Sequence, residues 1–190
     1  MTLLIIFLIC VFITLAVGVL AGVSDIKSMT IPNAYSVYVI ILFFLAYGAL
    51  YIGESSAEPF GPILYHLLAA LLMFIVTIIL FALGIIGAGD SKFATACAFW
   101  IGVKYVPVFL FFMTLCGGLL GVIALILRRK KPFKSPAEGS WVAQVQGGAD
   151  KVPYGVAITV GMLFAIVYAG YFSSDMLSAF VELHNVEFDL

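Results

Sequence analysis

Charged residues are what this sequence has least of. They make up only 10% of its 190 residues, whereas 64% are hydrophobic, and the net charge is −1. A water-soluble domain of this length could not cover so much apolar surface with so few charges. The composition therefore excludes a soluble enzyme and predicts a chain whose surroundings are the lipid bilayer.

Metal ligands and nucleophilic sets are also scarce. The three cysteines, Cys10, Cys97 and Cys116, lie inside apolar runs without C-x-x-C spacing, so we interpret them as small buried hydrophobes. The sequence contains no H-E-x-x-H motif, no Ser/His/Asp set and no nucleotide-binding fingerprint. We therefore expect no metal, no cofactor and no nucleic-acid partner.

Long uncharged runs are what the sequence does have. They predict an all-α membrane protein, a polytopic bundle of about six transmembrane helices. Most of the runs reach the roughly 20 residues that cross about 30 Å of hydrocarbon, but one of them is short and would need residues 90–92 as well. The runs cover 3–22, 34–53, 60–86, 93–103, 105–127 and 153–174. We expect 1–174 to form a single transmembrane domain and 175–190 an acidic tail.

Basic residues predict the orientation of these spans. Segment 128–151 carries most of them, and six spans place Lys27 and Lys92 on its side of the membrane. Because cytoplasmic loops collect Lys and Arg, we expect this segment to be a cytoplasmic, solvated connector and the acidic tail to be extracytoplasmic. A re-entrant hairpin at 93–103 would separate 128–151 from both lysines, so the charge pattern disfavours it.

Asp25 follows the first apolar run, in SDIKSMTIPN (24–33). A carboxylate is badly placed there for the helix dipole, because the C-terminal end of a helix is partially negative. The structural alternative is a partly solvated boundary residue paired with Lys27.

Asp90 ends the glycine-rich sequence GIIGAGD (84–90). Glycines let the backbone turn and let a helix or an extended peptide approach closely. The structural alternative here is an N-cap of the following helix.

The two aspartates are more informative together than apart, because six spans place both at one membrane face. Adjacent carboxylates can share one proton, so that one acts as a base and the other as an acid. Such a pair can activate water against a peptide bond without a metal or a nucleophilic side chain. His66 is expected near the far face and His184 in the tail, so neither is a candidate.

The motifs resemble those of a known family. SDIKSMTIPN, with GAGDSK some sixty residues later, is similar to the two aspartate motifs of type IV prepilin leader peptidases, which belong to the membrane aspartyl proteases named for Gly-x-Gly-Asp. KVPYGVAI (151–158) is similar to the closing motif of that family. The resemblance implies two catalytic aspartates, two motif glycines and two accompanying basic residues: Asp25, Asp90, Gly87, Gly89, Lys27 and Lys92.

The resemblance also implies a substrate and a location. The substrate would be a prepilin-like protein with a short basic leader and a hydrophobic N-terminal helix, cut after a glycine at the cytoplasmic face of the bacterial inner membrane. Large members methylate the new N-terminus through an additional region with paired cysteines, which this sequence does not show. It therefore resembles the short, peptidase-only branch associated with tight-adherence (Flp-type) pili.

Two other functions stay open at this point. One is a preflagellin-type peptidase of the same protease group. The other is a small six-helix transporter coupled to ions or protons, although such a protein would carry its carboxylates near the middle of the bilayer. The sequence does not predict an oligomeric state.

Overall fold

The computed structural model describes residues 2–52 and 60–174, and every regular element in these ranges is a helix. The predicted acidic tail at 175–190 lies outside the described residues. The helices are α1 (Thr2–Ser28), α2 (Asn33–Ile52), α3 (Ile63–Ala82), α4 (Ala88–Ala98), α5 (Gly102–Lys130), α6 (Trp141–Gln146) and α7 (Tyr154–Tyr168).

Four of the described helices, α1, α2, α3 and α5, are long and apolar enough to cross a membrane. The apolar helix α7 has 15 residues and is shorter. The prediction of a polytopic, all-α membrane protein is confirmed. The α5 helix is longer than the hydrocarbon core requires, since its 29 residues span about 43 Å. Its basic last turn, Arg128–Lys130, can therefore extend beyond the apolar layer.

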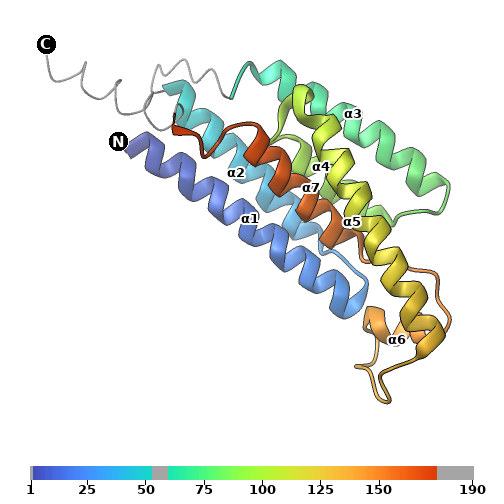
Figure 1. Cartoon of the computed structure of the whole chain (residues 1–190). Coiled ribbons are helices and arrows are strands. Elements are labelled where there is room, and N and C mark those ends of the chain that lie inside the picture. Colours follow the sequence, from blue (N-terminus) through green and yellow to red (C-terminus); the bar gives the residue numbers. More distant parts are fainter. Residues whose placement is uncertain (1, 53–59, 175–190) are drawn as a thin grey trace, which may run out of the picture.

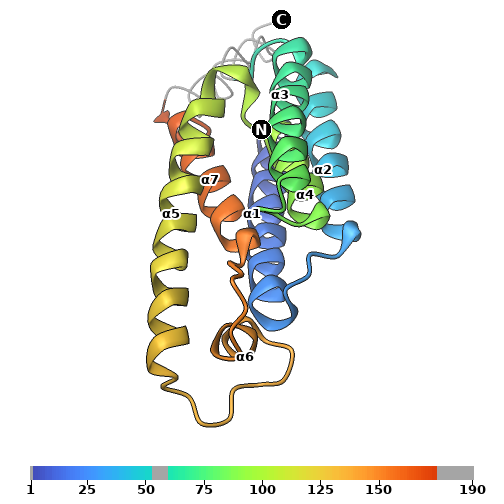
Figure 2. The same cartoon turned by 90° about the vertical axis from the view of Figure 1, so that its right-hand side faces the viewer.

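The short predicted span, 93–103, differs from the helix that forms. The α4 helix begins earlier and has 11 residues, which is about 16 Å, or roughly half of the hydrocarbon core. The chain then turns over 99–101 before α5 begins. Figure 2 shows that the last turn of α3 and the first turn of α5 lie toward opposite ends of the bundle. The α4 segment joins them, so it still returns the chain across the bundle.

Segment 128–151 is more structured than the solvated connector that the sequence predicts. It contains α6, which begins where the Ser140 hydroxyl accepts a hydrogen bond from the backbone N–H of Ala143 (3.2 Å). The indole of Trp141 is buried and donates a hydrogen bond to the carbonyl oxygen of Lys151 (2.8 Å). The side chain of Met29, just after α1, packs against the small hydrophobic cluster that contains Trp141. The segment therefore folds back against the end of the bundle where α1 ends.

The two ends of the bundle differ in content (Figures 1 and 2). At the end with α6 lie the last turns of α1 and α5 and the first turns of α4 and α7. Asp25 and Asp90 are thus at the same end, as the predicted spans require. The opposite end is filled by buried aromatic rings and one histidine: Phe7, Phe43, Phe60, His66, Trp100 and Tyr171.

Candidate active site

Asp25 lies in the last turns of α1, which continues to Ser28. Its residue surface is only 3% exposed, so it is not a solvated boundary residue. Its Oδ2 accepts a hydrogen bond of 2.7 Å from the backbone N–H of Gly155, in the first turn of α7. The carboxylate therefore points at the positive N-terminal end of α7, which offsets the unfavourable dipole of α1.

Asp90 lies in the first turn of α4, outside the four long spanning helices. It is the third residue of the helix and not its N-cap, which is Gly87. The Gly87 N–H donates a hydrogen bond of 2.7 Å to Asp90 Oδ2. Burial and, to a smaller extent, the Asp25 carboxylate raise the pKa of Asp90, and the Gly87 hydrogen bond lowers it; the net result is a pKa of about 6.

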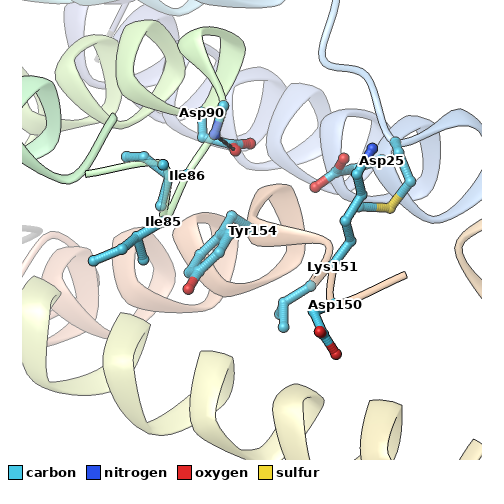
Figure 3. A pocket seen from close by; sticks show the side chains of 11 residues that line it. Asp25, Ile85, Ile86, Asp90, Asp150, Lys151 and Tyr154 are labelled. Atoms are coloured by element: carbon cyan, nitrogen blue, oxygen red, sulfur yellow. Dashed lines mark hydrogen bonds between the residues drawn. The ribbon is translucent and has the colours of Figure 1, made fainter. Parts of the chain in front are cut away.

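The two carboxylates face each other across one cavity. Figure 3 shows them pointing toward one another, with the Tyr154 ring below them and Ile85 and Ile86 to one side. The cavity has a volume of about 560 Å³. Its lining comes from α1, the α3–α4 connection and the start of α7: Asp25, Met29, Gly84, Ile85, Ile86, Gly87, Asp90, Asp150, Lys151, Val152 and Tyr154.

The candidate glycines allow close approach around Asp90. A Cβ on Gly87 would lie 3.1 Å from Asp90 Oδ2, and one on Gly89 would lie 3.3 Å from the Ile31 carbonyl oxygen. Both distances are tighter than ordinary van der Waals contact. In the structure these glycines fit the first turn of α4 against its own carboxylate and against the segment between α1 and α2. Contact between these two glycines and a substrate stays a prediction.

The candidate lysines lie beside the aspartates in sequence but act differently. Lys92 Nζ donates a hydrogen bond of 3.2 Å to Asn33 Oδ1, which connects the second aspartate motif to the I-P-N of the first. Lys27 is exposed, and the one ion pair within the described ranges joins Arg128 and Asp150. The pairing of Asp25 with Lys27 is therefore wrong.

The residues that the sequence excluded as candidates, His66 and the three cysteines, are not among those that line the cavity. His66 is buried in α3 at the opposite end, as predicted. Cys10 and Cys97 are buried, and Cys116 is partly buried. Within the part of the chain that the structure describes, no group of three or more His, Cys, Asp or Glu side chains could hold a metal ion.

Two residues near Asp25 and Asp90 were missed as functional candidates: Tyr154, which lines the cavity, and Gly155, which donates to Asp25. Both stand in the PYG sequence, which also starts a helix and in that sense is ordinary. The signal that could have found them was the similarity of KVPYGVAI to a family motif. Their proximity to Asp25 could not be deduced, because 130 residues separate Gly155 from it.

The fold and the site define a class: a polytopic helical membrane protein with two carboxylates, one buried and one partly buried, that face one another in a cavity at one end of the bundle. The sequence of residues 4–122 matches the type IV leader peptidase family. The chain belongs to this family, which confirms the resemblance seen in the aspartate motifs.

One curated relative is the prepilin leader peptidase/N-methyltransferase of Bacillus subtilis (strain 168). It is 28% identical over 163 residues, which cover 83% of this chain and 54% of the relative. The chain therefore spans about half the length of that protein. No solved structure matches the chain.

Proposed function

We propose that the chain is a membrane aspartyl endopeptidase that removes the short basic leader of type IV prepilin-like proteins, with Asp25 and Asp90 as its catalytic pair. The observation that carries this proposal is the placement of two carboxylates, the buried Asp25 and the partly buried Asp90, face to face in one cavity. Membership of the leader peptidase family supports it. The proposal concerns peptide cleavage only and includes no methyl transfer.

The chemistry needs one aspartate ionised and the other protonated. The ionised carboxylate takes a proton from water while the water oxygen attacks the scissile carbonyl carbon, and the protonated carboxyl gives its proton to the carbonyl oxygen. Collapse of the tetrahedral intermediate then breaks the C–N bond as the leaving amine takes up a proton. The raised pKa of Asp90 keeps a proton in the site toward neutral pH.

The shape of the site suits an extended substrate. A second, smaller hollow of about 290 Å³ lies on the other side of Asp90, between the segment after α1 and the first turn of α4. It shares Met29, Gly87 and Asp90 with the larger cavity. A peptide that runs from one hollow to the other would carry its scissile bond past Asp90, and the glycines would leave room for its backbone.

The location and the pilus type belong to the same proposal. The end of the bundle with Asp25 and Asp90 also carries the basic last turn of α5, so this end would face the cytoplasm of a bacterial inner membrane. For the pilus type we propose the tight-adherence (Flp-type) branch, and a preflagellin-type substrate is the alternative within the same chemistry.

The test is direct cleavage by the purified chain. Detergent-purified protein is incubated with a prepilin that carries a basic leader, and mass spectrometry locates the new N-terminus. The Asp25→Asn, Asp90→Asn double variant serves as the blank. We expect a single shortened product with the wild type only. A folded wild-type protein that leaves both prepilin and preflagellin intact would contradict the proposal.

A further inference from the structure

We propose that Gly155 is a positioning residue for Asp25: its backbone N–H, presented by the first turn of α7, fixes the carboxylate toward Asp90, and only glycine fits at this point. The inference rests on the proposed peptidase function and adds a residue that acts through Asp25 without touching substrate.

Space around Gly155 is the first part of the argument. A Cβ added there would lie 3.0 Å from Asp25 Cβ, 3.0 Å from Ile31 Cδ1 and 3.1 Å from the Ala21 carbonyl oxygen. The contacts with Asp25 and Ala21 involve atoms that α1 holds in place. Any side chain at 155 must therefore move α7 away from α1, and this movement would lengthen the 2.7 Å hydrogen bond to Asp25.

A second contact fixes α7 against α1 one turn further along. The Thr159 hydroxyl lies 2.8 Å from the Gly18 carbonyl oxygen of α1 and 2.7 Å from the Gly155 carbonyl oxygen of its own helix. The hydroxyl thus links α1 to the residue that holds Asp25. The backbone N–H of Gly155 is consequently fixed in direction as well as in distance.

The hydrogen bond has a chemical consequence for the pair. It occupies Asp25 Oδ2, and within the described residues no hydrogen bond to Oδ1 is found. Oδ1 is then available to water and to the reacting bond. Burial disfavours the charge on Asp25, and a backbone donor at a helix N-terminus favours it, so the Gly155 N–H partly offsets the effect of burial.

The first test compares two glycines of the same interface. A Cβ on Gly22 of α1 would meet the backbone and side chain of Val156 at 3.4 Å, which is ordinary contact. We expect Gly155→Ala to lower kcat by about 10²-fold with little change in KM, because a misplaced group loses alignment. Gly22→Ala should stay within about twofold of wild type. Equal losses in both variants would mean that α7 only needs close packing, and the proposal would fall.

The second test removes the donor and adds no atoms. Cell-free translation with glycolic acid at position 155 replaces the N–H by an ester oxygen. We expect kcat to fall at least about tenfold, a loss of about 1.4 kcal/mol, and the acidic limb of the kcat/KM profile to move to higher pH, since the ionised carboxylate loses a hydrogen bond.

An ester variant with the kcat and pH profile of the wild type would overturn the proposal, as would a loss of kcat without the shift of the acidic limb. Failure of the proposed function looks different. In that case the wild-type protein itself would cleave no substrate, or Asp25→Asn would cleave as well as wild type.

Discussion

The two ends of the bundle differ in the types of residue that fill them. At the far end, ring centroids of Phe43 lie 5.1–5.9 Å from those of its aromatic neighbours, including Phe60, His66 and Trp100. At the aspartate end, glycines and a cavity of about 560 Å³ surround two carboxylates. The aromatic end is closely packed, and the other end holds the candidate site.

Polar atoms are also treated differently at the two ends. At the aromatic end the polar side-chain atoms of three residues contact backbone carbonyl oxygens. The Trp100 indole donates a hydrogen bond to Val39 at 3.0 Å, and the Tyr171 hydroxyl donates one to Trp100. The two His66 ring nitrogens contact the carbonyls of Phe60 and Phe99. At the aspartate end each carboxylate receives one backbone hydrogen bond through Oδ2. We infer that the packed end fixes the helices, so that the other end can keep two carboxyl groups together around open space.

The largest expected difference between the two ends is the loss of cleavage when a carboxylate is replaced. Asp25→Asn and Asp90→Asn should each lower cleavage by about 10³-fold or more, because an amide can neither take a proton from water nor deliver one to the leaving group. Neither variant should unfold at a lower temperature than the wild type. The measurement pairs a cleavage assay with thermal unfolding of the same purified samples.

If the two aspartates act as one unit, as proposed, the double variant should be no less active than either single variant. Glu138→Gln, in the exposed part of the loop, is the control and should cleave at the wild-type rate. Near-normal processing by Asp90→Asn would mean that this residue only starts a helix.

The aromatic end should show the reverse behaviour. Phe43→Ala removes a fully buried ring and should lower the free energy of unfolding by about 3 kcal/mol through the cavity that it leaves. The kcat of the protein that remains folded should be unchanged. Phe44→Ala is the matched control, since the neighbouring ring is 49% exposed on the outside of α2, and its cost should be about 1 kcal/mol or less. Equal costs, or a lost kcat in folded Phe43→Ala, would remove the distinction between the two ends.

The same contrast explains what the sequence could predict. The spans follow from uncharged length, which is local information, and both aspartates stand beside recognisable glycine and proline patterns. The helix α6 has only six residues and no span-like signature, so it was invisible. The start of α4 depends on the hydrogen bond that Asp90 accepts from the Gly87 N–H. The alternative that made Asp90 the N-cap placed this start three residues too late. Gly155 meets Asp25 only through tertiary packing, and a glycine carries no side-chain signal of its own.

The smallest expected effect is on the free energy of unfolding, which the ionised Asp90 carboxylate lowers. The pKa of Asp90 rises from 3.8 to about 6 on folding, so the folded state binds more protons than the unfolded state between these values. Stability from this group is therefore complete below about pH 4 and is lost as the pH rises through about 6. Asp90→Asn removes the ionisation and keeps a side chain of the same size. We expect it to be more stable than wild type above pH 7, by on the order of 1–2 kcal/mol, given 1.36 kcal/mol per pKa unit and partial solvent screening. The difference should vanish near pH 4, which thermal unfolding of both proteins from pH 4 to 8 would measure. A variant that is less stable than wild type by the same amount at every pH would show that Asp90 serves the start of α4 more than it strains the site.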